Sequence, residues 1–226
     1  MCGETVTIPE AGTVPRSRTV TKHPQASPYD SLAELYDPWS ASVTEDVGFY
    51  LEEARRAALA GVELDLRVGD LRDPPVRERV PLVICPFRSF LHLHTDDERR
   101  RALAAAHRLL PSGGRLIFDV FAPQPDDIEQ THDRWLEREP GIWERAVWDT
   151  GARTLTLSVR GDGSAAATMA LAWIEPEEWR VLLEETGFEI EACYGWFDRS
   201  PFTGGEDTIW VAEAQADRPR GRQTVP

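Results

Sequence analysis

The sequence predicts an α/β fold with a shortened, mostly parallel sheet and an inserted set of antiparallel strands. Three observations predict it. Short apolar runs at residues 81–85 and 115–121 have the composition of buried parallel strands. An amphipathic segment at 95–110 supplies the helical crossover that joins two parallel strands. Residues 142–173 instead alternate apolar and polar side chains, which is the pattern of antiparallel strands with one buried face.

Two helices are expected ahead of the first apolar run. Residues 29–37 carry apolar side chains at helical spacing on one face. A second helix follows Thr44, because Phe49, Tyr50 and two later alanines recur at the same spacing. Gly61 can end this helix.

The segment 62–68 is expected to form a further strand of the same sheet. It alternates apolar and polar side chains and ends at Gly69. Pro74 and Pro75 prevent a helix from starting directly afterwards. We expect this strand to pair with 81–85, because an unpaired edge strand attracts other chains.

Two later helices have clear boundary signals. Thr95 and Glu98 form a capping box, in which each residue hydrogen-bonds the backbone of the other, and Pro111 lies just beyond the end of that helix. The other helix begins with Pro176 in its first turn and ends before Gly187. The strands expected in the insertion and after this helix are 142–148, 154–159, 168–173, 188–197 and 208–214.

Length and charge bound the kind of protein. The chain has 226 residues and a formal net charge of -14. We expect a disordered leader at 1–27, one folded domain at 28–214 and a disordered tail at 215–226. The acidic excess argues against nonspecific nucleic-acid binding, which needs a basic surface. No apolar run is long enough to cross a membrane.

The cysteines favour a reducing compartment. There are three, Cys2, Cys85 and Cys193, and no two of them form a C-x-x-C pair. An odd count without paired spacing does not suit a disulfide framework or a structural zinc site. Three free thiols and a cytoplasmic location are therefore expected.

Five segments carry short motifs in a fixed order, among them YDSLAELYD, GDLRD and LLPSGGRLIFDV. The segments are Tyr29–Asp37, Val68–Asp73, Leu82–Leu93, Leu109–Val120 and Leu182–Phe188. In pattern and order they resemble class I S-adenosylmethionine-dependent methyltransferases, over about residues 29–214. The resemblance implies a Rossmann-like fold and S-adenosylmethionine as methyl donor.

The resemblance also implies which residues hold the cofactor. Asp70 would accept a hydrogen bond from the adenine amino group, and the backbone N–H of Leu71 would meet a ring nitrogen. Phe87 and Arg88 would flank the methionine part, at the carboxyl end of a strand where ligands of open α/β sheets bind. His92 would lie near the transfer site and contact substrate or act as a base.

Other roles are open for these residues. Asp70 also suits a turn after a strand, Phe87 a core position, Arg88 a surface ion pair and His92 loop packing. His92 and His94 could ligate a metal, but their spacing points to no third ligand, so no metal site is predicted.

The sequence departs from the family pattern in one large respect. Family members carry a glycine-rich loop after their first strand and an acidic residue at the end of the second. Here the interval between the entry helices and the strand 62–68 is only residues 55–61. A strand–helix–strand unit needs about 30 residues or more, so it cannot fit there. The first strand, the loop and the second strand are therefore missing.

The favoured function is methyl transfer from S-adenosylmethionine to a small molecule. Such a transfer is an in-line displacement, so the protein mainly aligns donor and acceptor, and no catalytic residue is assigned. The alternatives are a non-catalytic remnant or interaction module with impaired cofactor binding, and an incomplete gene model. An exposed sheet edge would also favour self-association.

Overall fold

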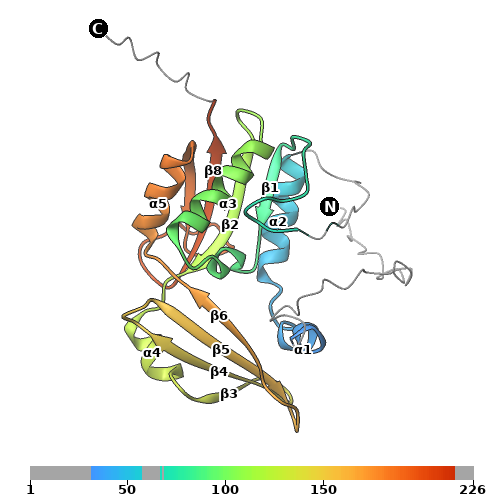
Figure 1. The fold of residues 1–226 in the computed structure, drawn as a ribbon, viewed down its shortest axis with the longest axis vertical. Coiled ribbons are helices and arrows are strands. Elements are labelled where there is room, and N and C mark those ends of the chain that lie inside the picture. The colour runs from blue at the N-terminus through green and yellow to red at the C-terminus, as the bar shows by residue number, and fades with distance from the viewer. Residues whose placement is uncertain (1–31, 58–66, 68, 217–226) are drawn as a thin grey trace, which may run out of the picture.

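A computed structural model of the protein describes residues 32–57, 67 and 69–216 (Figure 1). The predicted leader, all but two residues of the predicted tail, and Cys2 lie outside the described residues. So does nearly all of the predicted strand 62–68, together with its expected pairing to 81–85.

The main sheet has four strands in the order β1-β2-β8-β7. They are β1 (Leu82–Cys85), β2 (Arg115–Phe121), β7 (Phe188–Tyr194) and β8 (Asp207–Ala214). β1 pairs parallel with β2, while β8 is antiparallel to both β2 and β7. The predicted α/β fold is confirmed. β1, β2 and β7 run in one direction, but two of the three pairings are antiparallel, because β8 lies between β2 and β7 and runs against both.

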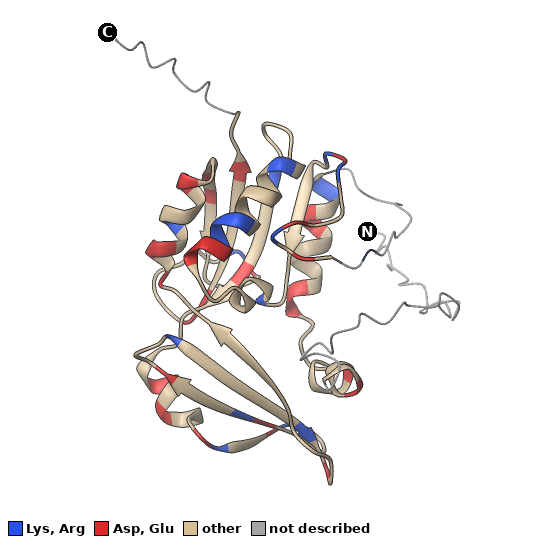
Figure 2. Cartoon of the chain, viewed as in Figure 1, with Lys and Arg blue, Asp and Glu red and all other residues tan. Residues whose placement is uncertain are grey.

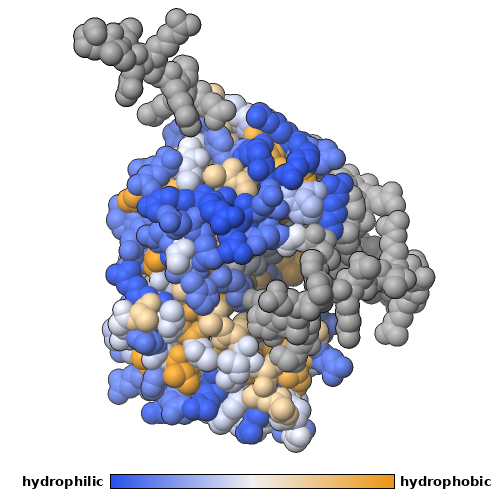
Figure 3. Space-filling model, in the orientation of Figure 1, coloured by the Kyte–Doolittle hydropathy of each residue, from blue (hydrophilic) through white to orange (hydrophobic). Residues whose placement is uncertain are grey.

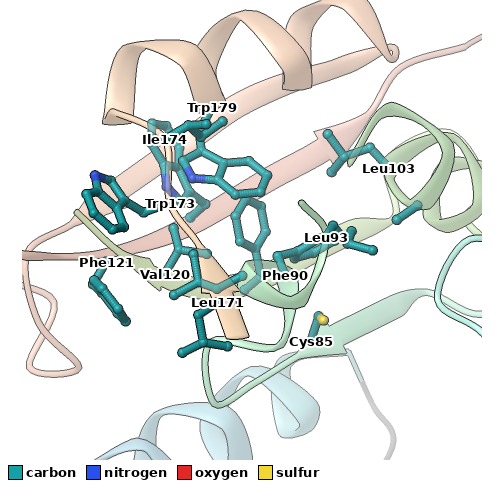
Figure 4. Packing of buried hydrophobic residues seen from close by; sticks show 14 of the residues in the cluster. Cys85, Phe90, Leu93, Leu103, Val120, Phe121, Leu171, Trp173, Ile174 and Trp179 are labelled. Atoms are coloured by element: carbon teal, nitrogen blue, oxygen red, sulfur yellow. The ribbon is translucent and has the colours of Figure 1, made fainter. Parts of the chain in front are cut away.

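Helices cover both faces of this sheet. On one face, Phe49 and Tyr50 of α2 (Glu45–Arg56) pack on Leu82 and Ile117. The other face is covered by α3 (Asp96–Leu109) and α5 (Pro176–Glu185). Figure 4 shows this second layer, in which the ring of Trp179 lies beside that of Phe90, with 5.7 Å between centroids. The apolar run of β2 is thus buried on both sides, as is typical of parallel strands, while the edge strand β1 is buried only at Leu82 and Cys85.

The boundary signals predicted for α3 and α5 are confirmed, whereas the entry helix ends at Trp39, two residues beyond its predicted end at 37. Thr95 Oγ1 accepts a hydrogen bond from the N–H of Glu98, and the Glu98 carboxylate accepts one from the N–H of Thr95. α5 begins at Pro176, and Gly187 follows it with a φ of 93°, which glycine adopts without strain. The entry helix α1 spans Ala33–Trp39.

The insertion forms a sheet of its own, in the order β3-β4-β5-β6. Its strands are β3 (Trp135–Glu139), β4 (Ile142–Asp149), β5 (Thr154–Gly161) and β6 (Ala167–Ala172), all paired antiparallel. The three predicted strands are confirmed. β3 and the short helix α4 (Pro125–Thr131) are additions, in a stretch whose polar composition gives little periodic signal.

The second sheet lies beyond the carboxyl ends of β1 and β2, with α1 beside it (Figure 1). Leu155, Leu157 and Val159 of β5 share one buried cluster with Phe90 and Phe121 of the main layer. The second sheet therefore packs beside the edge where a ligand of an open α/β sheet is expected.

The two layers differ in surface character. Acidic and basic residues lie close to one another along α3 and its surroundings (Figure 2). On the same face, apolar residues gather over the second sheet (Figure 3). Among the described residues, no helix combines the length and apolar content that a membrane crossing requires.

Candidate active site at the carboxyl edge of the main sheet

The loop after β1 has an unusual backbone. Phe87 and Arg88 both lie in the left-handed region, with φ of 58° and 57°. Each such non-glycine residue costs about 1–2 kcal/mol unless its surroundings compensate. Compensation comes from Asp119 of β2, whose Oδ1 accepts from the N–H of Phe87 and whose Oδ2 accepts from the N–H of Arg88, both at 2.9 Å.

A third donor completes the environment of this carboxylate. The hydroxyl of Tyr50, on α2, donates to Asp119 Oδ1 at 2.5 Å. Asp119 is only 6% exposed, and this burial raises its pKa, while the hydrogen bonds from Tyr50, Arg88 and Phe87 act against the rise. Burial, followed by the adjacent Asp119, raises the pKa of Tyr50 far above its ordinary value. Three elements therefore meet at one buried carboxylate.

The side chain of Arg88 extends along the same edge toward β8. Its Nη2 donates to Asp207 Oδ1 at 2.7 Å, and its guanidinium lies 4.8 Å from the centroid of the Phe121 ring. Glu206 is the neighbour of Asp207, and burial first, then the charge of Asp207, raises its pKa to about 6. Arg88 forms the ion pair that was the alternative to its predicted cofactor contact, and 42% of its side chain is still exposed.

Phe87 joins the loop to the second sheet through α1. Its ring lies edge-on to Tyr36 and Trp39, with centroid distances of 5.8 and 6.0 Å. The indole Nε1 of Trp39 donates to Glu144 of β4 at 2.9 Å. Phe87 and Trp39 are half-buried and Tyr36 is exposed, and together the three rings form an apolar surface beside the loop.

Asp70 lies in a tight exposed turn. Its Oδ1 accepts from the backbone N–H of Arg72 at 2.8 Å, and its Oδ2 accepts from Arg72 Nη2 at 2.7 Å. These hydrogen bonds, the side-chain one first, lower the pKa of Asp70 to about 2. Leu71, the next residue of the turn, is 43% exposed. Arg72 also forms an ion pair with Glu98 in the first turn of α3. The turn is thus fastened to the helix that follows the loop after β1.

His92 ends a short 3₁₀ helix, η1 (Ser89–His92), that contacts β2 and β6. Burial lowers its pKa, opposed by a hydrogen bond with the carbonyl of Ala170. His94 Nε2 lies 3.2 Å from the same carbonyl oxygen. Loop packing against β6 is therefore observed, and the role of His92 toward a substrate stays a prediction.

Other features of the described residues lie elsewhere. No group of three or more potential metal-ligating side chains is found in this part of the chain. A cavity of about 430 Å³ lies at the opposite edge of the main sheet, with His107, Ser112 and Gln215 in its lining. A cavity of about 100 Å³ lies between α2 and β7, bordered by Glu53 and Arg199.

The structure brings Phe87 and Arg88 together with three residues that the sequence did not indicate: Asp119, Tyr50 and Asp207. One signal was available for Asp119, which is the charged residue inside the apolar run LIFDVF. A buried acid needs partners, so this position could have been used to predict a hydrogen-bond network. Tyr50 and Asp207 carry no comparable signal.

No protein-family model and no curated protein sequence matches the chain. Among solved structures, a S-adenosylmethionine-dependent methyltransferase from Clostridium acetobutylicum matches with a TM-score of 0.65 and 11% identity, over 83% of this chain and 99% of that one. The CcbJ methyltransferase from Streptomyces caelestis matches with a TM-score of 0.55 and 22% identity, over 66% of this chain and 63% of that one.

These likenesses define the class of fold. The chain has the Rossmann-like fold of S-adenosylmethionine-dependent methyltransferases, which confirms the predicted fold. It spans less than two thirds of the length of the Streptomyces enzyme.

Proposed function

We propose that the protein is a S-adenosylmethionine-dependent methyltransferase acting on a small molecule. The observation that carries the proposal is the loop after β1, held in a left-handed conformation at the carboxyl edge of the sheet. Ligands of open α/β sheets bind at this edge. The fold, the position of the second sheet and the net charge of -14 support a small acceptor over a nucleic acid.

The residues present fit the donor in part. The Asp70 carboxylate is 49% exposed, and an ionised carboxylate offers about four acceptor positions, so it can accept a further bond beside those from Arg72. Leu71 is exposed next to it. Phe87 and Arg88 would flank the methionine part of the donor. When bound, S-adenosylmethionine supplies an electrophilic methyl group, and the chain aligns the acceptor with it and excludes water.

His92 is the residue we assign to the acceptor side. It lies between the loop after β1 and β6, where both sheets meet. Burial lowers its pKa, which favours the neutral imidazole near pH 7. A neutral imidazole can accept a proton from an acceptor group during methyl transfer.

The second candidate is a non-catalytic, methyltransferase-derived interaction module. The observation that favours it is the short segment between α2 and the Asp70 turn, residues 57–69. It cannot contain a strand, a glycine-rich loop and a second strand. β1 is the edge strand of the main sheet within the described residues, so this candidate would self-associate there. Sedimentation analysis tests this, because a monomer at all concentrations contradicts it.

Calorimetric titration with S-adenosylmethionine separates the two candidates. An enzyme binds with micromolar affinity, whereas no heat at millimolar ligand contradicts the enzyme. Sequencing the transcript tests whether the sequence comes from an incomplete gene model. An additional in-frame stretch that encodes a glycine-rich loop would establish that it does.

Asp70→Asn tests the assigned adenine contact. We expect it to weaken donor binding about tenfold, because it removes a charged acceptor. The matched control is Asp73→Asn, in the same exposed turn, whose carboxylate pairs with Arg77 and Arg108. Equal loss of affinity in both variants would contradict the assignment.

A further inference from the structure

We propose that Asp119 is a positioning residue that fixes the loop after β1 and thereby the direction of Arg88. The part that concerns the methyl donor rests on the proposed function. The part that concerns the loop stands on hydrogen-bond geometry alone.

The position of Asp119 follows from the strand register. β1 and β2 pair in parallel, with Cys85 opposite Phe118 as the last pair. Asp119 is the next residue of β2, so it lies where the chain leaves β1. From there each carboxylate oxygen accepts one backbone N–H, from Phe87 and from Arg88. Two successive amides directed at one anion are compatible with the left-handed backbone of both residues.

The carboxylate is itself held in place. Tyr50 donates to the Oδ1 that also accepts from Phe87, so rotation of the carboxylate would break contacts with α2 and the loop together. Tyr50 is buried among aromatic rings, with Phe49 at 5.3 Å and Phe197 at 6.0 Å between centroids. The hydroxyl therefore approaches Asp119 from a rigid layer.

Both ends of Arg88 are consequently fixed by the main sheet. Asp119 holds its backbone N–H, while Asp207 and the ring of Phe121 hold its guanidinium. The side chain remains partly exposed at the carboxyl edge. An arginine oriented in this way can bind a ligand without first losing the freedom of its backbone.

Burial of the Asp119 carboxylate lowers the stability of the fold, so stability does not explain why an acid occupies this core position. Within the described residues, no arginine, lysine or histidine forms a salt bridge with Asp119. A buried carboxylate without an ion-pair partner is expensive, and an apolar residue would suit the core better. The cost is offset by three hydrogen bonds, two of which shape the loop at the candidate site, and by the positive charge of the nearby Arg88.

The test compares Asp119→Asn with Ile117→Val. Both residues are buried in β2, and the apolar side chain of Ile117 packs on the α2 side, where it accepts no hydrogen bond from the loop. Hydrogen exchange should accelerate at the Phe87 and Arg88 amides by about tenfold or more in Asp119→Asn, beyond any change in the strand amides. In Ile117→Val, the loop and strand amides should change together. Unchanged relative exchange at Phe87 and Arg88 would overturn the proposal.

Donor titration supplies the functional outcome. Asp119→Asn should weaken S-adenosylmethionine binding, while Ile117→Val should leave it unchanged. Accelerated loop exchange with unaltered donor affinity would overturn the link to the site. If the wild-type protein does not bind the donor, the proposed function and that link are both contradicted. Amide exchange then still tests whether Asp119 fixes the loop after β1. Tyr50→Phe keeps the ring and removes one donor, so it serves if Asp119→Asn does not fold.

Discussion

The Glu206 carboxyl group connects the candidate site to the pH dependence of stability. Its pKa is raised to about 6, first by burial and then by Asp207, whereas an unfolded glutamate titrates near pH 4.3. The folded state therefore binds this proton more tightly. The associated stability is fully present below about pH 4 and is lost as the pH rises through about 6.

Glu206→Gln should remove this pH dependence. At pH 8 we expect the variant to be more stable than wild type by about 1 kcal/mol, a value reduced from the full shift because the side chain is partly exposed. At pH 4 the two should be equal. Urea unfolding at both pH values measures the difference, with the exposed Glu189→Gln as a control for the loss of a charge. A constant difference at both pH values would refute the explanation.

His92 and His94 form a matched pair for testing the acceptor side. Both histidines lie near the Ala170 carbonyl, but His92 is the more buried and is the one assigned to the acceptor. His92→Asn should lower kcat about 100-fold or more without changing donor affinity, as expected for a general base. His94→Asn should leave kcat near the wild-type value. Equal effects of the two substitutions would favour a packing role for both.

At the scale of elements, the two threonines that precede α2 and α3 differ in their contacts. Thr95 accepts a hydrogen bond from Glu98 and completes a capping box, whereas Thr44 makes no side-chain capping bond. Thr95→Ala should therefore lower the free energy of unfolding by about 1 kcal/mol, and Thr44→Ala by much less. Denaturant unfolding of both variants measures this. Similar losses in the two variants would contradict the capping geometry.

Elements with local signals could be predicted from the sequence. The capping box, Pro176 and the apolar runs of β1 and β2 are short-range patterns, and the structure has each element. β3 was missed because its side chains are half-buried or exposed, so they show no clear alternation. The division into two sheets was also beyond the sequence pattern, because strand pairing depends on contacts between distant residues.

The site could be predicted only in part, for the same reason. The resemblance located Phe87 and Arg88, and the structure shows both in one ordered loop. The residues that order them are far away in the sequence: Asp119 is 31 residues from Arg88, and Tyr50 is 69 residues from Asp119. No local pattern reports such contacts.

At the scale of the whole molecule, the two edges of the main sheet differ. At the carboxyl edge lie the loop after β1, the aromatic residues of α1 and the second sheet. The opposite edge holds the cavity bordered by His107 and Gln215. We propose that the methyl donor binds at the carboxyl edge of the main sheet, although only residues 57–69 separate α2 from the Asp70 turn.

Hydrogen exchange with and without S-adenosylmethionine tests this claim most directly. We expect slower exchange in peptides that cover residues 69–72 and 86–92, with little change around the opposite cavity. Protection confined to peptides near His107 and Gln215, or no protection at millimolar donor, would contradict it.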